Sequence, residues 1–339
     1  MDFGIKMKRG VRRGSILCLF LAFWGFGCND NHPNQSHTQT DRPVSPASAF
    51  EKDSAYAYVA RQVAFGPRTP GSEAHARCAD YLYAVLAGYA DTVMRQPFEA
   101  ERWDGQPMQG VNLIASFAPE KARRVLLAAH WDSRPYADRE TDPAWRHKPI
   151  DGANDGASGV GVLLEVARVL STHPQAVGVD IVFFDLEDAG RPDFEPYKPG
   201  DEATWCKGAQ HWATHPHVPG YTAVYGILLD MVGNRQPMFA QEATSYYYAA
   251  DILDKVWRVA AESGYGAVFV PNRTGGIIDD HLFINRMTGI PMIDIIHKDF
   301  GTSTGFFPQW HTLQDNMAQI DPNTLEIVGK TVLETLYRE

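Results

Sequence analysis

Acidic residues and histidines of this sequence gather where apolar runs end. The segment FFDLEDAG, residues 183–190, places Asp185, Glu187 and Asp188 directly after such a run. Neighbouring carboxylates repel one another unless a cation or protons neutralise them. Four further segments carry similar groups: His130 after LLAA, Asp155 in GANDGASG, Asp230 after GILL, and His311 in WHT. Carboxylate and imidazole are ligands of zinc, so the pattern predicts a zinc site.

Each of these residues also has an ordinary structural explanation. Asp155 could cap the helix that follows it, Asp230 could stand in a turn, and His130 could be a satisfied buried histidine. Glu187 and Asp188 could form a solvated strand end. We favour the metal site because the carboxyl ends of successive strands in an α/β sheet lie side by side, so these groups would meet there.

The adjacent pair Glu187 and Asp188 permits a division of labour. Consecutive side chains of an extended segment point to opposite sides, so one carboxylate can bind a metal ion while the other accepts a proton. Asp185 is expected to have a structural role. A catalytic zinc site also leaves one coordination position open for substrate.

The segments between these residues predict a single α/β domain. Continuous apolar strands alternate with helical patterns, which is typical of a mostly parallel, twisted central sheet with helices on both faces. We see no internal repeat and no second domain. Helices are expected at 49–65, 74–88, 159–170, 202–214, 244–263 and 321–337, and strands at 91–99, 110–117, 124–129, 177–186, 222–230 and 290–296.

The first residues are not expected to belong to this domain. Five basic residues precede an apolar run from Ile16 to Phe26, an arrangement typical of a secretory signal. Cys28 follows that run and resembles the cysteine of a bacterial lipobox. We therefore predict a signal peptide at 1–28 with Cys28 as the lipidated first residue of the mature chain. The alternative is an ordinary cleaved signal with an incidental cysteine.

The predicted domain order continues with a tether and a catalytic domain. Residues 29–47 are polar and contain almost nothing to bury, which predicts a flexible tether, and 48–339 form the catalytic domain. We expect an exported lipoprotein, in the periplasm or cell envelope of a Gram-negative-type cell, attached to the membrane through Cys28. Beyond the signal region only Cys78 and Cys206 remain, as one disulfide or two free thiols.

The charge of the chain argues against one class of partner. The formal net charge is −10, and no basic stripe follows residue 30. Binding of nucleic acid requires clustered lysine and arginine, so we expect no nucleic-acid partner.

The ordered motifs HWDS (130–133), GANDGASG (152–159), ED (187–188), LLD (228–230) and WHT (310–312) resemble the zinc aminopeptidase-like superfamily. Within it, the chain is most similar to the animal-type, zinc-dependent glutaminyl cyclases, including their bacterial lipoprotein branch. The segments IIDDH (277–281), GIPMIDII (289–296) and FFPQWHT (306–312) carry this similarity. The resemblance covers roughly residues 50–338 and implies a zinc aminopeptidase-like (phosphorylase/hydrolase-like) fold.

The resemblance also implies roles for individual residues. Asp155, Asp188 and His311 would be the ligands of a single zinc ion, and Glu187 the proton-transferring acid/base. Asp230 and the aspartate at 279 match catalytic carboxylates that hydrogen-bond around that base. The expected substrate-binding residues are Trp310, Phe307, Trp205 and Ile278.

Some positions depart from the animal pattern. Asp188 stands where animal members carry glutamate, and Ile278 stands where they carry an amide that touches substrate. Asp294 replaces a histidine of the hydrogen-bond network. The roles of Asp294 and of His130 are left open.

The implied reaction converts the N-terminal glutamine of peptides or proteins into pyroglutamate with release of ammonia. Zinc would polarise the γ-carbonyl, and Glu187, with a pKa raised by Asp230 and Asp279, would shuttle the proton. We expect a monomer. The main alternative is a two-zinc aminopeptidase that also uses His130 and Asp230 as ligands. A surface binding protein with a degenerate metal site is a third possibility.

Overall fold

The computed structural model describes residues 45–339, so the predicted signal peptide, Cys28 and most of the predicted tether lie outside the described residues. The helices and strands follow one another in the order α1 (Lys52–Val63), α2 (Glu73–Ala87), β1 (Thr92–Glu101), β2 (Pro107–Phe117), β3 (Arg124–His130), α3 (Ala157–Thr172), β4 (Gly178–Phe184), α4 (Lys207–Thr214), β5 (Tyr225–Asp230), β6 (Phe239–Gln241), α5 (Ala243–Glu262), β7 (Phe269–Arg273), α6 (Asp280–Thr288), β8 (Met292–Ile296) and α7 (Pro322–Tyr337).

A six-stranded sheet forms the centre of the domain, with strand order β1-β2-β4-β3-β5-β8. Strands β4, β3, β5 and β8 run parallel to one another, whereas β2 is antiparallel to both of its neighbours. The predicted α/β architecture with a mostly parallel sheet is therefore confirmed. A small separate sheet pairs β6 with β7.

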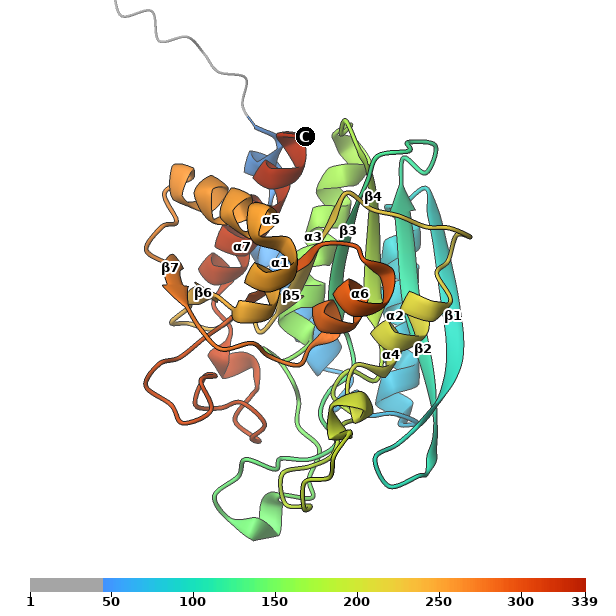
Figure 1. The fold of residues 1–339 in the computed structure, drawn as a ribbon, viewed down its shortest axis with the longest axis vertical. Coiled ribbons are helices and arrows are strands. Elements are labelled where there is room, and N and C mark those ends of the chain that lie inside the picture. Colours follow the sequence, from blue (N-terminus) through green and yellow to red (C-terminus); the bar gives the residue numbers. More distant parts are fainter. Residues whose placement is uncertain (1–44) are drawn as a thin grey trace, which may run out of the picture. The chain divides into compact units, whose positions relative to one another are not determined.

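Helices cover both faces of the central sheet (Figure 1). Alternate residues of a strand point to opposite faces, and in β3, β4, β5 and β8 both sets are mostly apolar and buried. One set packs with α1, α2, α3, α5 and α7 in the larger core, and the other packs with α4 and α6. All seven residues of β4 are buried, which explains why its sequence is apolar apart from Asp180.

Two parts of the fold differ from the sequence prediction. The helix predicted at 202–214 is interrupted: a short 3-10 helix at Asp201–Thr204 precedes α4, and Cys206 between them has a left-handed φ of 55°. A right-handed helix cannot pass through that conformation. Helix α6 and the strands β6 and β7 were not predicted; β6 has only three residues.

The described chain begins with a 3-10 helix at Pro46–Ala49, which includes the last two residues of the predicted tether. Ala47 and the following Phe50 are buried, and Phe50 packs on Gly329 of α7. Both cysteines of the domain, Cys78 and Cys206, are buried free thiols. Among residues 45–339, no helix combines the length and apolarity needed to cross a membrane.

Candidate metal centre and active site

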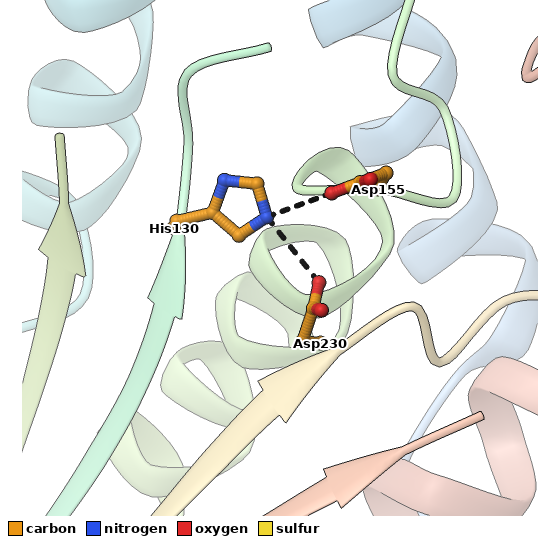
Figure 2. Close-up of side chains that lie close together, drawn as sticks. All are labelled: His130, Asp155 and Asp230. Carbon is orange, nitrogen blue, oxygen red and sulfur yellow. Dashed lines mark hydrogen bonds and ion pairs between the residues drawn. The ribbon is translucent and has the colours of Figure 1, made fainter. Parts of the chain in front are cut away.

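The parallel strands bring the predicted site residues to one edge of the sheet. Strand β3 ends at His130 and β5 ends at Asp230, while Glu187 and Asp188 follow β4. Because β4, β3, β5 and β8 are neighbours, their carboxyl ends form a single crevice. Asp155 enters it from the loop before α3 (Figure 2). Every one of these side chains is buried.

Asp155 is not the cap of the helix that follows it. The N-cap of α3 is Gly156, with a left-handed φ of 92°. The Asp155 carboxylate instead lies between two histidines, with Oδ1 3.1 Å from His130 Nε2 and Oδ2 3.6 Å from His311 Nε2. A side chain at Gly156 would meet the ring of His130 at 2.9 Å, so the close approach requires glycine.

Asp155, Asp188 and His311 form a group with the geometry of a metal site. Their ligand atoms all lie within 4.8 Å of one another, and His311 Nε2 is 3.4 Å from Asp188 Oδ1. Both carboxylate oxygens of Asp188 are buried, and neither has a hydrogen-bond partner among the described residues. The three residues offer two carboxylate oxygens and one imidazole nitrogen. This set fits a zinc ion that keeps one coordination position open.

Asp138, which the sequence motifs did not reveal, orients the histidine of this group. Its Oδ1 lies 3.1 Å from His311 Nδ1, and its Oδ2 accepts a hydrogen bond of 2.6 Å from Arg134. Burial alone would raise the pKa of Asp138, but His311 and Arg134 together hold it well below its usual range. With Nδ1 directed at Asp138, Nε2 of His311 faces the two aspartate ligands.

Two further carboxylates fix the loops that carry the ligands. The backbone N–H groups of Glu187 and Asp188 both donate to Asp132, at 3.1 Å each. The N–H of Asp155 donates to Asp315 at 3.0 Å. Neither bracing residue was predicted, because each contact joins segments that are distant in the sequence.

A second ligand group lies beside the first and shares Asp155 with it. His130 Nε2 is 3.1 Å from Asp155 Oδ1 and 3.3 Å from Asp230 Oδ1 (Figure 2). The ligand atoms of these three residues also lie within 4.8 Å of one another. The ligand sets for one metal ion and for two adjacent ions are therefore both present.

Glu187 lies next to the first group and is the candidate base. Burial raises its pKa well above the usual value, and the charges of Asp279 and Asp188 add to the effect, against the opposing charge of His130. The predicted direction is thus confirmed, with burial as the largest cause. The thiol of Cys206 donates to Glu187 Oε1 at 3.2 Å.

The two remaining catalytic candidates are also buried at this edge. Asp230 ends β5, and burial together with the charges of Asp155 and Asp279 raises its pKa to about 8, although the hydrogen bond from His130 opposes this. Asp279 is the N-cap of α6. A ligand atom of Asp279 lies within 4.8 Å of atoms of both Glu187 and Cys206. Among the described residues, neither Asp279 nor Asp230 forms the expected hydrogen bond with Glu187, and Oδ2 of Asp279 is buried without a hydrogen-bond partner.

Asp185 completes the acidic segment that ends β4, and it takes no part in the ligand groups. Its carboxylate lies 2.9 Å from His75 Nε2 on α2 and accepts the backbone N–H of Val111 at 2.7 Å. These contacts join β4 to α2 and β2. The structural role predicted for Asp185 is confirmed.

A cavity of about 260 Å³ opens onto the ligand groups and Glu187. Its apolar wall includes three of the four predicted substrate residues, and His311 is flanked by two of them: Trp310 stacks on its ring at 3.8 Å and Trp205 lies parallel at 6.2 Å. The wall is formed by Trp205, Met231, Ile277, Ile278, Ile296, Phe306 and Trp310.

The assignment of Phe307 to this wall needs correction. Phe307 is only 1% exposed and packs against the wall residues Met231 and Ile296 without lining the cavity, whereas its neighbour Phe306 lines it. Consecutive aromatic residues in a loop face different directions, and sequence alone did not indicate which one faces the site.

Comparison with known proteins gives one family match and several similar structures. The profile of peptidase family M28 matches residues 112–336. The glutaminyl cyclase of Tannerella forsythia is 52% identical, with a TM-score of 0.83, over 86% of this chain and 99% of that chain. A Zn-dependent exopeptidase from Parabacteroides distasonis is 49% identical, with a TM-score of 0.83, over 86% and 99% of the two chains.

A curated relative is more distant. The glutaminyl-peptide cyclotransferase of Gloydius blomhoffii is 28% identical over 247 residues, which make up 65% of this chain and 62% of that protein. The match therefore spans less than two thirds of the relative's length. Together these matches confirm the resemblance to glutaminyl cyclases that the sequence motifs indicated.

Proposed function

This chain belongs to peptidase family M28, and from that premise we propose that it is a zinc-dependent glutaminyl-peptide cyclotransferase. It would convert the N-terminal glutamine of peptides or proteins into pyroglutamate and release ammonia. The observation that carries the proposal is the small cavity of about 260 Å³, whose aromatic wall stands beside the group Asp155, Asp188 and His311 and the buried Glu187. Its size suits a single side chain.

Asp155, Asp188 and His311 would hold one zinc ion in this site. When bound, the ion supplies Lewis-acid polarisation of the carbonyl of the substrate γ-carboxamide. Asp138 keeps Nε2 of His311 directed at the metal position, and the N–H bonds to Asp132 keep Asp188 in place. The ligands are therefore positioned before substrate arrives.

Glu187 would move the proton during ring closure. The α-amine nitrogen bonds to the γ-carboxamide carbon, Glu187 takes the proton of that amine, and the same proton passes to the departing ammonia. The attack occurs within one molecule and forms a five-membered ring. Holding the two reacting groups in this orientation lowers the activation barrier by up to roughly 7–11 kcal/mol. Trp205, Phe306 and Trp310 would confine the side chain and exclude water.

A two-zinc aminopeptidase is the second candidate function. The observation in its favour is the group of His130, Asp155 and Asp230, which shares Asp155 with the first group as a bridging ligand would. We favour the cyclase with one zinc ion because Trp310 and Phe306 narrow the cavity beside the metal position. One of the solved relatives is named an exopeptidase, so the test must separate the two activities.

The test combines a metal count with two substrates. Purified protein is assayed for ammonia and pyroglutamate from glutamine peptides, and for amine release from leucine anilides, while zinc per chain is measured by mass spectrometry. We expect cyclisation and about one zinc ion per chain. Hydrolysis of the anilide without cyclisation, together with two ions, would favour the aminopeptidase.

We also propose that the mature chain is attached to the cell envelope through lipidated Cys28. Support comes from the basic residues and the apolar run Ile16–Phe26 that precede this cysteine. Replacing Cys28 by alanine should move the protein from the membrane fraction to the soluble fraction of the producing cells. An unchanged distribution would exclude the lipid anchor.

We propose further that the enzyme acts as a monomer. Support comes from the candidate site, because one chain supplies the ligand groups, the candidate base and the wall of the cavity. Light scattering of the purified protein at assay concentrations checks this proposal. A dimer that loses activity on dilution would contradict it.

A further inference from the structure

A second cavity adjoins the proposed active site. It measures about 450 Å³ and lies between the loop 298–306, which follows β8, and the segment 274–277, which precedes α6. Ile277 and Phe306 line both cavities, so the two share a wall. The part of a peptide that follows its N-terminal glutamine must leave the first cavity, and the second cavity lies directly beside it.

The positively charged group of this second cavity is Lys298. The residue is only 6% exposed, and its ammonium lies 3.9 Å from the centroid of the Phe306 ring. Within the described chain the ammonium makes neither a hydrogen bond nor an ion pair, whereas the backbone N–H donates to the carbonyl oxygen of Met238 at 2.8 Å, and burial lowers the pKa of the side chain. The ammonium therefore lies on an aromatic ring at the wall of the cavity with no counter-ion, and an anion that enters the cavity would pair with it.

The carboxylates near Lys298 form no ion pair with it. Asp294 is buried, its oxygens accept no hydrogen bond among the described residues, and its Oδ2 lies 4.0 Å from His281 Nδ1. Glu242 accepts the N–H of Thr244 at 2.7 Å and lies 3.0 Å from His281 Nε2. Asp299, which also lines the cavity, accepts the N–H of Gly301 at 2.7 Å. The positive charge of the lysine is therefore left available to a ligand.

The loop that presents Lys298 has a defined internal structure. The N–H of Asp299 donates to the carbonyl oxygen of Gly305 at 2.9 Å, and the hydroxyl of Thr302 donates to the carbonyl oxygen of Phe306 at 2.7 Å. Gly305 has a left-handed φ of 75°, and a side chain there would lie 3.4 Å from the Lys298 ammonium. Glycine therefore keeps the approach to the ammonium open.

A line of aromatic contacts joins this lysine to the metal group. The Lys298 ammonium lies 3.9 Å from the Phe306 ring, that ring 4.7 Å from Trp310, and Trp310 3.8 Å from the ring of His311. An extended peptide advances about 3.3–3.6 Å per residue. A peptide whose first residue reaches the metal position can therefore bring its second, third or fourth residue to Lys298.

We propose that the Lys298 cavity is a substrate subsite that binds a carboxylate of the peptide at the second to fourth residue. The subsite rests on the proposed cyclase function and adds a preference for acidic sequences. The carboxylate can come from an aspartate or glutamate side chain or from the C-terminus of a short peptide. Its contact with the Lys298 ammonium would be a charge-assisted hydrogen bond at the wall of the cavity.

The experiment compares peptides that differ only in charge. C-terminally amidated tetrapeptides with N-terminal glutamine carry glutamate, or its neutral isostere glutamine, at position two, three or four. A matched pair with free and amidated C-termini and no acidic side chain tests the second source of the carboxylate. We expect kcat/KM to be roughly tenfold higher for the acidic peptide at one position at least.

Three variants link that preference to the lysine. In Lys298→Met the ratio of acidic to neutral peptide should fall to about one, and in Lys298→Arg it should largely persist. The control Lys148→Met removes an exposed lysine and should keep the wild-type ratio. A ratio near one in the wild-type protein at every position, or an unchanged ratio in Lys298→Met, would overturn the subsite.

Calorimetric binding of the same peptides separates the two proposals. Normal turnover without any charge preference would remove the subsite and leave the cyclase standing. If no peptide is cyclised, the proposed function fails. In that case the ratio of the binding affinities for acidic and neutral peptides still tests the subsite: a ratio well above one supports it, and a ratio near one rejects it.

Discussion

At the scale of single residues, the pair of Asp138 and His311 controls how the metal position is presented. His311 has a left-handed φ of 56°, a conformation that costs roughly 1–3 kcal/mol and is tolerated where surrounding contacts over-determine it. The 3.1 Å contact to Asp138 is one such contact. It also fixes which ring nitrogen carries the proton.

Replacing Asp138 by asparagine should weaken zinc binding about 10- to 100-fold, because the imidazole loses its charged partner. Competition with a chromophoric chelator measures this affinity. The control Asp80→Asn removes an exposed aspartate that is paired with Arg95, and it should bind zinc like the wild type. Equal zinc affinity in Asp138→Asn and wild type would contradict the orienting role.

Glu187 is the residue on which the proposed proton transfer depends. Glu187→Gln keeps the size of the side chain and removes its basicity, so kcat should fall by roughly 10²- to 10⁴-fold. Zinc content should be retained, since Glu187 belongs to neither ligand group that contains Asp155. The exposed Glu202→Gln serves as the control. A kcat within threefold of wild type would rule out Glu187 as the base.

At the scale of elements, the site depends on how closely α3 approaches β5. Gly159 in the first turn of α3 faces the carbonyl oxygen of Leu229, and a side chain there would overlap with it. This contact sets the spacing between Asp155, just before α3, and Asp230, at the end of β5.

Gly159→Ala should lower the free energy of unfolding by about 1–3 kcal/mol, because the new methyl group would overlap with the Leu229 carbonyl oxygen, and backbone atoms move aside less easily than side chains. It should also weaken zinc binding, since the Asp155 loop moves with the helix. Urea unfolding and zinc titration measure the two effects. Gly266→Ala is the matched control, because a side chain there finds its nearest neighbour at 3.6 Å. If Gly159→Ala and Gly266→Ala have the same free energy of unfolding, the close packing of α3 on β5 does not contribute to stability as argued.

The elements that position the site were readable from the sequence for a physical reason. Strands buried on both faces are continuous apolar runs, so β3, β4, β5 and β8 and the residues at their ends could be predicted. Helix α6 was missed because it is short and its first two residues, Asp280 and His281, are polar and follow another aspartate.

The carboxylates that brace the ligands could not be predicted in the same way. Asp138 and Asp132 stand in irregular segments, and Asp315 receives the N–H of a residue 160 positions earlier. Nothing local distinguishes them from solvated aspartates. Their role follows from tertiary contacts alone.

At the scale of the whole molecule, the metal ion would join segments from most of the chain. Asp155, Asp188 and His311 come from three separate loops. When no cation is present, burial of Asp188 and the neighbouring charge of Asp155 together raise the pKa of Asp188 to about 6. Removal of zinc by a chelator should therefore lower Tm, and added zinc, but not magnesium, should restore it. An unchanged Tm after verified metal loss would argue against a bound ion at this position.

The opposite part of the sheet contains a buried ionic cluster that should govern acid stability. Asp180 near the start of β4 is fully buried and accepts hydrogen bonds from Arg124 at 2.6 Å, Ser116 at 2.6 Å and Tyr221 at 2.7 Å. Burial alone would raise its pKa, but these donors and the nearby His217 hold the pKa well below its usual range. The ionised form is therefore favoured by folding.

A depressed pKa in the folded state gives stability that is present above the unfolded pKa of about 3.9 and is lost as pH falls toward the folded value. Asp180→Asn should cost roughly 3 kcal/mol at pH 7, since it removes the charge of a fully buried carboxylate and leaves the partly buried Arg124 without its counter-charge. The difference from wild type should shrink as pH falls below 4, because only the wild type loses this contribution. Urea unfolding from pH 7 to pH 3 measures this difference, and Asp53→Asn, at an exposed aspartate, is the control. A difference in the free energy of unfolding that does not change with pH would exclude Asp180 as a source of acid lability.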